Sequence, residues 1–235
     1  MSREKILKNH YNSVTFTDSD WFLLKEKRRS ALKLLNLFEK EGIKSFIYGS
    51  IARGDIHQDS DIDIIIPQSI PSYQIEFILH KNGYSNYFRE IIMATPKDSI
   101  KLYIYLSELE SITVPLSKLD KNTMDFYDFG GKLSFNELKS DIRTSGIDKR
   151  LVLIKPTPNG YKEYSVIGNE HLAAKEINVS INTINERKKV LLKRQKHGRT
   201  GVFLKRQLDI NESTEEVLKK LSDKKSIIRK KLYQR

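Results

Sequence analysis

The chain has 235 residues, of which 38 % are hydrophobic, and this is enough apolar material for one large or two small folded domains. The absence of cysteine excludes disulfides, thiolate metal sites and a cysteine nucleophile. No apolar run approaches the roughly 18 residues that span a bilayer, and the charged N-terminus lacks the apolar segment of a signal peptide. These features predict a cytoplasmic protein that has no membrane partner.

The net charge of +12 is concentrated near the end of the sequence. Residues 171–235 carry 18 Lys and Arg against 7 Asp and Glu, so this segment holds +11 of the total. Such an excess predicts a polyanionic partner for the C-terminal region. A role in solubility alone is the alternative, although acidic residues serve that purpose at least as well.

The sequence begins with a helical pattern that is followed by two extended runs. N-cap residues at 17–20 precede apolar residues at helical spacing, which predicts one long helix up to Gly42. Short apolar runs at 43–48 and 62–66 predict two buried strands, because each is bounded by glycine, proline or polar loop residues. We expect these strands to be neighbours.

A second helix and a hairpin follow. Pro71 stands where a first helical residue would, and the apolar stripe after it ends at Asn82. Apolar runs at 88–95 and 100–106 flank a turn and predict two antiparallel strands. This order of elements predicts an α+β fold in which a small mixed sheet carries helices on one side.

The pattern dissolves after about residue 114, and we place an interdomain connection there. Two extended runs at 151–154 and 161–167 then flank Pro158-Asn159-Gly160, which is a strong hairpin signal. Helical periodicity and the positive charge continue from there to the end. The predicted organisation is a first domain at 1–125, a linker at 126–149, a second domain at 150–208 and a C-terminal basic helix at 209–235.

The loop between the first two predicted strands carries the chemistry. Gly49 and Ser50 end one strand, and glycine lets backbone N–H groups approach phosphate oxygens closely. Asp61 and Asp63 are two residues apart on an extended run, so both carboxylates emerge on one face. Two such carboxylates suit a hard cation such as Mg²⁺, whose other ligands are phosphate oxygens and water. The combination predicts nucleotidyl transfer, in which charge is neutralised as an α-phosphate is attacked and pyrophosphate leaves.

This spacing resembles the minimal nucleotidyltransferase motif of the DNA polymerase beta superfamily: Gly49-Ser50, ten intervening residues, then Asp61-Ile62-Asp63. The resemblance covers residues 20–110 and implies a polymerase-beta-like mixed sheet with helices. It also implies an NTP substrate and Mg²⁺ as cofactor, with Mn²⁺ as the alternative. The residues that it assigns to the nucleotide are Gly49, Ser50, Arg53 and Ser60, and those that it assigns to catalysis and the metal are Asp61 and Asp63.

The third carboxylate of that family is where the sequence departs from the pattern. The family uses a third acid on a later strand, whereas residues 100–106 contain none and Lys101 aligns with that position. We expect Glu90, on the facing strand of the hairpin, to supply the missing catalytic oxygen; an ion pair with Lys101 is the alternative. Asp98 and Glu108 lie beyond the strand ends and are weaker candidates. Without a replacement, the domain binds nucleotide and transfers slowly or not at all.

The C-terminal half resembles a winged helix-turn-helix domain. Residues 170–177 and 181–193 have helical patterns, and Asn178 between them tolerates the left-handed turn that glycine usually makes. Residues 196–204 predict a turn and a strand, hence a wing, and the preceding hairpin completes its sheet. Asparagine can read adenine, while basic side chains contact phosphates. The predicted contacts to nucleic acid, DNA or RNA, are Asn182, Asn185, Lys189, Lys193, Arg194, Lys196 and Arg199.

The last apolar stripe, from Val217 to Leu232, predicts a final helix that packs across the domains or mediates a homodimer. The sequence as a whole predicts an enzyme that transfers a nucleoside monophosphate from an NTP to a hydroxyl acceptor, with a nucleic-acid-binding C-terminal domain. Two alternatives remain open. One is a DNA-binding transcriptional regulator whose first domain only binds nucleotide, and the other is a protein-modifying nucleotidyltransferase of toxin–antitoxin type.

Overall fold

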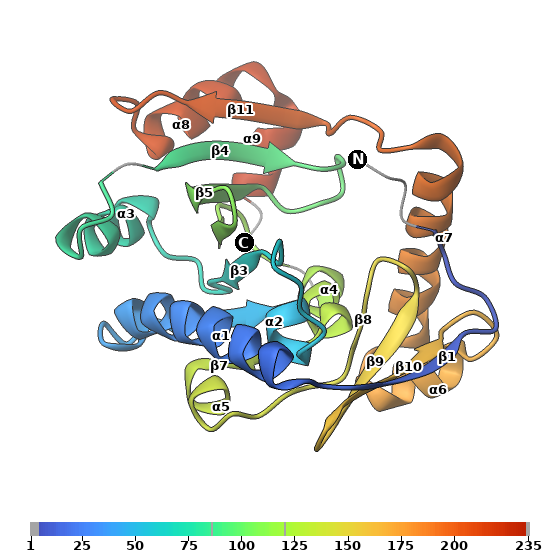
Figure 1. Cartoon of the computed structure of the whole chain (residues 1–235). Helices are drawn as coiled ribbons and strands as arrows, with labels where there is room; N and C mark the ends of the chain where they lie inside the picture. The colour runs from blue at the N-terminus through green and yellow to red at the C-terminus, as the bar shows by residue number, and fades with distance from the viewer. Residues whose placement is uncertain (1–4, 86, 120, 234–235) are drawn as a thin grey trace.

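The computed structural model describes residues 5–85, 87–119 and 121–233, and the strands in these ranges form two sheets (Figure 1). In these ranges no helix is both long and apolar enough to cross a bilayer. The larger sheet contains, in spatial order, β11 (Leu204–Leu208), β4 (Phe88–Met93), β5 (Lys101–Ser107), β6 (Glu110–Pro115), β3 (Ile62–Ile65), β2 (Phe46–Tyr48) and β7 (Lys132–Ser134). The smaller sheet contains β1 (Tyr11–Thr15), β10 (Gly160–Ser165), β9 (Val152–Thr157) and β8 (Gly146–Ile147).

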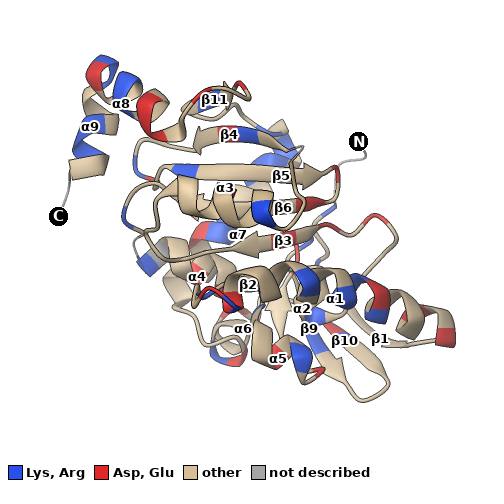
Figure 2. Cartoon of the chain, turned by 90° about the vertical axis from the view of Figure 1, so that its left-hand side faces the viewer, with Lys and Arg blue, Asp and Glu red and all other residues tan. Residues whose placement is uncertain are grey.

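One face of the larger sheet packs against the helices α1 (Asp18–Glu39), α3 (Ser72–Lys81), α8 (Thr214–Lys224) and α9 (Ser226–Tyr233). The start of α1 is the predicted one: the Thr17 hydroxyl accepts from the N–H of Asp20, whose carboxylate accepts from the N–H of Thr17. Phe38 of α1, Ile75 of α3 and Ile228 of α9 are buried in the core of this sheet. Figure 2 shows α1 and α3 against the sheet and α8 near β11.

The opposite face carries α4 (Lys121–Gly130), so helices lie on both sides of the sheet and the prediction of one side is wrong. Tyr127 of α4 is buried, and its ring lies 4.9 Å from that of Tyr48 on β2. The short helices α2 (Ser50–Arg53) and α5 (Phe135–Lys139) follow β2 and β7 directly. Because Tyr48 sits beside the predicted phosphate loop, this is the face on which the candidate site is built.

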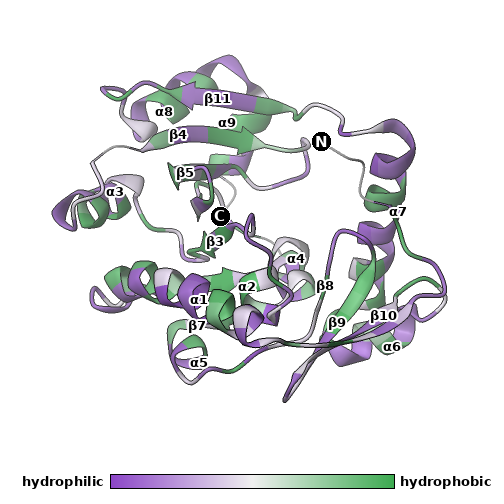
Figure 3. Ribbon diagram, in the orientation of Figure 1, coloured by the Kyte–Doolittle hydropathy of each residue, from purple (hydrophilic) through white to green (hydrophobic). Residues whose placement is uncertain are grey.

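The smaller sheet packs on α6 (Glu170–Glu176) and α7 (Ile181–His197) around a second core. Leu151, which directly precedes β9, and Ile184 of α7 are both fully buried in it, and Figure 3 shows the apolar character of β9. The predicted turn between the helices is present, because Asn178 has a φ of 52° and the Ser180 hydroxyl accepts from the N–H of Thr183. The helix pair is therefore confirmed.

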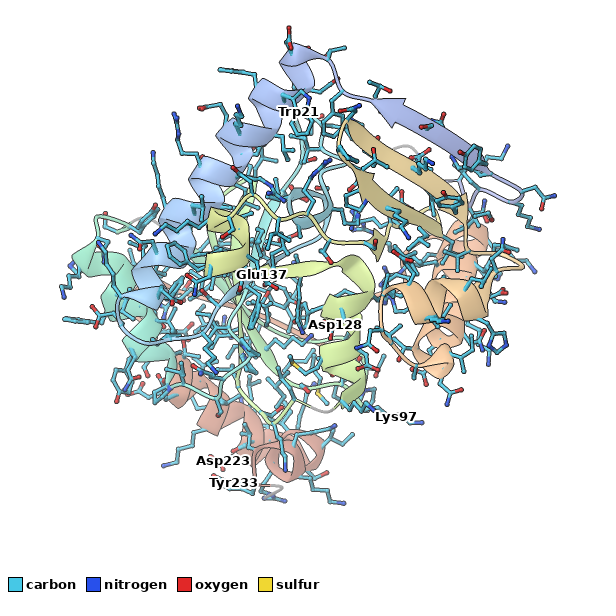
Figure 4. All side chains as sticks on the ribbon, turned by 90° about the horizontal axis from the view of Figure 1, so that it is seen from below. Trp21, Lys97, Asp128, Glu137, Asp223 and Tyr233 are labelled. Atoms are coloured by element: carbon cyan, nitrogen blue, oxygen red, sulfur yellow. The ribbon has the colours of Figure 1, made fainter. Side chains whose placement is uncertain are left out.

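Arg143 joins the two sheets. Its guanidinium lies 5.1 Å from the ring of Trp21, which is in the first turn of α1 beside the strands of the smaller sheet (Figure 4). The same group donates to the carbonyl of Gly160 at 2.8 Å and to that of Thr157. The ring of Phe16 adds an edge contact with Trp21 at 4.8 Å. Stacking and hydrogen bonds thus fix the smaller sheet against the start of α1.

The two halves interlock, and the predicted boundaries differ from the structure in three places. β1 falls inside the predicted first domain, 1–125, yet it pairs with β10 of the smaller sheet. The predicted linker, 126–149, contains the end of α4 together with β7, α5 and β8. β11 falls inside the predicted second domain, 150–208, yet it belongs to the larger sheet. The N-terminal strand β1 therefore belongs to the smaller sheet, which is otherwise formed by later residues, and the late strand β11 belongs to the larger sheet, which is otherwise formed by earlier residues.

The predicted wing is wrong for the same reason. β11 pairs antiparallel with β4, with Leu204 opposite Met93, and both Leu204 and Leu208 are buried in the first core. Without β11, β4 would be an edge strand with a row of unpaired N–H and C=O groups. The hairpin of β9 and β10 completes its sheet with β1 and β8 instead.

The predicted final helix is two helices, α8 and α9, with Lys225 between them in an extended conformation. Val217 of α8 and Ile228 of α9 are buried in the first core, and Leu221 and Leu232 pack against it. These apolar residues are consumed within the chain. The stripe therefore packs mostly within the chain, which agrees with the expectation that it packs across the domains, and Ile227 is its exposed member.

Arg89 holds the C-terminal segment on the sheet. We expect Arg89→Met to lower the free energy of unfolding by about 3 kcal/mol, because the guanidinium is buried, pairs with Glu76 at 2.8 Å and donates to the carbonyls of Asp209 and Glu212. Urea unfolding followed by circular dichroism measures this. The control is Arg29→Met, whose exposed pair with Glu26 should change stability by less than about 1 kcal/mol. Equal losses in both variants would contradict the assignment.

Candidate functional site

The site is built where β2 and β3 lie side by side. They are antiparallel, and Tyr48 stands directly opposite Asp63. On the other side of β3, the parallel strand β6 places Ser111 level with Asp63. Because side chains alternate along strands, Ile62 and Ile64 point into the core while Asp63 points to the face that carries α4. The sequence prediction that the acidic run is a strand next to the Gly-Ser strand is confirmed.

The loop after β2 leaves room for a ligand. Gly49 has φ 87° and ψ −147°, a conformation that side chains disfavour, and a Cβ added there would meet no atom within 4 Å. Its N–H donates to the carbonyl of Gly131 at 2.9 Å, which fixes the loop. The N–H groups of Ser50 and Ile51 open α2 and so have no acceptor within the helix. Two aligned N–H donors beside open space suit an anionic oxygen.

Asp63 is half-buried, and the Ser111 hydroxyl donates a hydrogen bond to its carboxylate. Burial raises the pKa of its carboxyl, the hydrogen bond from the Ser111 hydroxyl at 2.6 Å lowers it, and Asp61 raises it further. Lys149, in the turn between β8 and β9, lowers it as well. A desolvated carboxylate beside a second one is costly, and a bound cation would offset that cost.

Asp61 lies on the exposed approach to Asp63. It directly precedes β3, and the loop before it is held by the Ser60 hydroxyl, which accepts from the N–H of His57 at 2.8 Å. Lys27 of α1 donates to the carbonyl of Ser60 at 2.9 Å. Asp61 is close enough to raise the pKa of Asp63, and two neighbouring carboxylates suit a divalent cation that keeps water or phosphate as further ligands. The donor set therefore fits Mg²⁺ or Mn²⁺.

A family model described as a nucleotidyltransferase domain matches residues 27–231, which is most of the chain. The chain belongs to the nucleotidyltransferase domain family. No curated protein and no solved structure gives a match. Membership of the family supports nucleotidyl transfer in general, with an NTP as substrate and typically a divalent metal ion.

Arg53, which the family resemblance assigned to the nucleotide, is engaged elsewhere. Its guanidinium makes a bidentate ion pair with Asp55, with both N···O distances at 2.9 Å, and donates to the carbonyl of Gly130 at 2.6 Å. It is only 5 % exposed. We therefore assign Arg53 to holding α2 against α4, and only its backbone remains near the loop.

Glu90 does not reach the aspartate pair. It lies on β4 opposite Tyr103, as predicted, but β5 and β6 separate β4 from β3. Three strand spacings of about 4.8 Å, together with an offset of two residues along the strand, put it more than about 14 Å from Asp63. Its carboxylate pairs instead with Lys205 at 3.0 Å and accepts from the Tyr105 hydroxyl at 3.5 Å. The expectation that Glu90 supplies the third oxygen is wrong, and the alternative ion pair is made with Lys205 rather than Lys101.

On the side away from β2, the neighbour of β3 is β6, a strand that the sequence analysis missed. Its residues on the site face are Ser111 and Thr113, so a hydroxyl stands where a third carboxylate would be expected. Among the described residues, no group of three acidic or histidine side chains is placed to hold a metal ion. Glu110 of β6 lies level with Ile62 rather than with Asp63. It acts on the opposite face of the sheet, where burial, and to a lesser extent the Glu110 carboxylate, raises the pKa of Tyr84.

Tyrosines line the same face, and they were not among the residues predicted for the site. Burial raises the pKa of Tyr103 to about 12, with a further contribution from Asp63. Burial and Asp63 also raise the pKa values of Tyr48 and Tyr127, so these phenols stay neutral. Lys101, aligned at first with the missing acid, donates to the Tyr127 hydroxyl at 3.2 Å. The period-2 spacing of Lys101 and Tyr103 could have placed both on one face.

The predicted nucleic-acid residues lie along α7 and the loop after it. Asn182, Lys189 and Lys193 are exposed and Asn185 is half-buried; Arg194, Lys196 and Arg199 are exposed as well. A residue that the sequence analysis missed, Arg187, lies on the ring of Phe126 at 4.6 Å. Burial lowers its pKa to about 10, and Arg194 adds to this. The helix thus carries exposed cations along its length, and its Arg187 packs on α4.

We expect Asp63→Asn to melt at a higher temperature than the wild type in EDTA at neutral pH. Burial disfavours the charged carboxylate, whereas the amide oxygen can still accept from Ser111. Because the folded-state pKa of Asp63 is raised, the difference between the two proteins should shrink as the pH falls toward the ordinary value of aspartate. Differential scanning fluorimetry measures it, and a lower melting temperature for Asp63→Asn would contradict the assignment.

Proposed function

We propose that this protein transfers a nucleoside monophosphate from an NTP to a hydroxyl acceptor, with a divalent cation as cofactor and with release of pyrophosphate. The observation that carries the proposal is the pairing of β2 with β3. It brings the open Gly49 loop, which suits a phosphate, beside the carboxylate of Asp63, which suits a cation. Family membership supports the same reaction class.

Each residue has a separate task in this proposal. The N–H groups of Ser50 and Ile51 bind oxygens of the triphosphate, and the absence of a side chain at Gly49 lets them come close. Asp61 and Asp63 hold Mg²⁺ or Mn²⁺, which neutralises charge that develops on the α-phosphate and the leaving pyrophosphate. Ser111 orients Asp63 through its 2.6 Å hydrogen bond, and Lys149 adds positive charge from the smaller sheet.

The proton of the acceptor hydroxyl needs a destination outside the aspartate pair. Ser111 and Thr113 occupy the position on β6 where an acid could have accepted it. We therefore propose that the proton passes to solvent or to a substrate phosphate. General base catalysis typically contributes between about 100- and 10⁴-fold, so turnover should be slow for this reaction class.

We further propose that the α6–α7 pair binds nucleic acid. The exposed cations of α7 and the net charge of +11 in residues 171–235 support this. If transfer is not observed while salt-sensitive binding is, the DNA-binding regulator with a nucleotide-sensing domain is favoured. If the label enters protein, the toxin–antitoxin type is favoured.

Nucleotidyl transfer is tested with α-labelled NTPs, Mg²⁺ and separate RNA, DNA and protein acceptors. We expect Asp61→Ala and Asp63→Ala each to lower the rate of labelling by at least about 100-fold. The matched control is Asp59→Ala, because Asp59 is an exposed acid in the same loop, and it should retain activity. EDTA should abolish labelling, and Mn²⁺ should restore it. Equal labelling by wild type and Asp63→Ala would contradict the proposal.

Nucleic-acid binding by α7 is tested through its salt dependence. We expect Lys193→Ala and Lys196→Ala each to reduce the slope of log K against log salt by about 1, as the loss of one phosphate contact does. Fluorescence anisotropy with a labelled duplex at several salt concentrations measures the slope. Lys40→Ala, at the exposed end of α1, is the control. A slope unchanged in both α7 variants would exclude this helix as the contact.

A further inference from the structure

A row of side chains leads from Asp63 across the sheet on the face of the candidate site. Asp63 is level with Ser111 of β6, Ser111 with Tyr105 of β5, and Tyr105 with Phe88 of β4. Strands lie about 4.8 Å apart, so Tyr105 stands about 10 Å and Phe88 about 14 Å from Asp63 along this row. A small polar residue is therefore followed by two rings.

The rings form a preformed surface. Phe88 and Tyr105 lie with centroids 5.2 Å apart at 33°, and Tyr103 stacks on Tyr105 at 6.2 Å and 16°. The Tyr105 ring packs against the rings of both Phe88 and Tyr103, which fixes its orientation, and its hydroxyl also donates to buried Glu90 at 3.5 Å. Phe88 is nevertheless 39 % exposed. These rings are ordered before any ligand binds, which reduces the entropic cost of stacking on them.

The rings open into a groove of about 610 Å³ at the end of the sheet. Its lining is mainly apolar and includes Ile210, which follows β11 and is 80 % exposed. Exposed apolar side chains gathered in one groove are typical of a binding surface. The residues that line it are Tyr87, Phe88, Tyr105, Ser107, Glu108 and Ile210.

The groove lies on the side from which the acceptor must approach the α-phosphate. In-line displacement requires the attacking oxygen to approach the α-phosphate from the side opposite the leaving pyrophosphate. The Gly49 loop lies on the β2 side of Asp63, so the triphosphate extends toward β2. The acceptor must then enter from the β6 side, and the first large surface that it meets there is the ring of Tyr105.

We propose that Tyr105 and Phe88 are the acceptor platform: the bases at the 3′ end of a single-stranded nucleic acid stack on them and present the terminal hydroxyl to the site. This rests on the proposed function. The 3′ oxygen forms a bond to the α-phosphorus as the bond to the pyrophosphate oxygen breaks, and the hydroxyl proton passes to solvent. Every base offers a flat face for stacking, and the net charge of +12 favours a polyanion over a cationic or neutral acceptor.

The test is anisotropy with labelled single-stranded RNA and DNA, without NTP or metal. We expect Tyr105→Leu and Phe88→Leu each to weaken binding by between about 5- and 150-fold, the range for loss of one stacked base. Tyr105→Phe is the matched control, because it keeps the ring and loses only the hydrogen bond to Glu90, and it should bind like the wild type. An oligonucleotide with an abasic 3′ end should bind the wild type as weakly as the intact one binds Tyr105→Leu.

Two results would overturn the platform. One is equal affinity of the wild type, Tyr105→Leu and Phe88→Leu for every oligonucleotide. The other is transfer of label to an amino sugar or a protein without any oligonucleotide binding, which would leave nucleotidyl transfer itself standing. The proposed function is tested separately by the melting temperature of the wild type, which Mg²⁺ and NTP should raise. If they do not raise it, the proposed function is contradicted. The platform residues Tyr105 and Phe88 do not bind the nucleotide or the metal, so this result does not depend on them.

Discussion

The antiparallel pairing of β2 with β3 fixes the distance between a phosphate loop and a half-buried carboxylate, and the remaining features of the site depend on it. Tyr48 and Asp63 face each other across this pair, so the Gly49 loop opens beside the carboxylate. The cost is visible in the raised pKa of Asp63, which burial causes and which the Ser111 hydroxyl and Lys149 only partly offset. A half-buried carboxylate such as that of Asp63 lowers the stability of the fold, and proteins typically keep such groups where function requires them.

The interlocked ends of the chain explain why the second sheet matters to the site. β1 joins the smaller sheet and β11 joins the larger one, so the two cores cannot separate without breaking strand pairs. Lys149 reaches the neighbourhood of Asp63 from the smaller sheet, and Arg187 of α7 stacks on Phe126 of α4. The C-terminal half thus lies beside the candidate site and also carries most of the net positive charge.

Local signals in the sequence predicted the local structure. The cap at Thr17, the glycine at 49, the extended acidic run and the turn at Asn178 each depend on a few adjacent residues, and each is present. The errors concern partners distant in the sequence. Nothing near Ser111 says that β6 will lie parallel to β3, so the position of the missing carboxylate was assigned to the wrong strand. β4 likewise pairs with β11, which lies more than a hundred residues later in the sequence, and no local signal indicates this pairing.

The account is tested most directly by a crystal structure of the protein with Mn²⁺ and a non-hydrolysable NTP. It predicts anomalous density for Mn²⁺ bound by oxygens of both Asp61 and Asp63 and shared with the α-phosphate. The β- and γ-phosphates should accept from the N–H groups of Ser50 and Ile51, and the β6 side should be left open for the acceptor. A triphosphate bound elsewhere, or Mn²⁺ absent from this carboxylate pair, would contradict it.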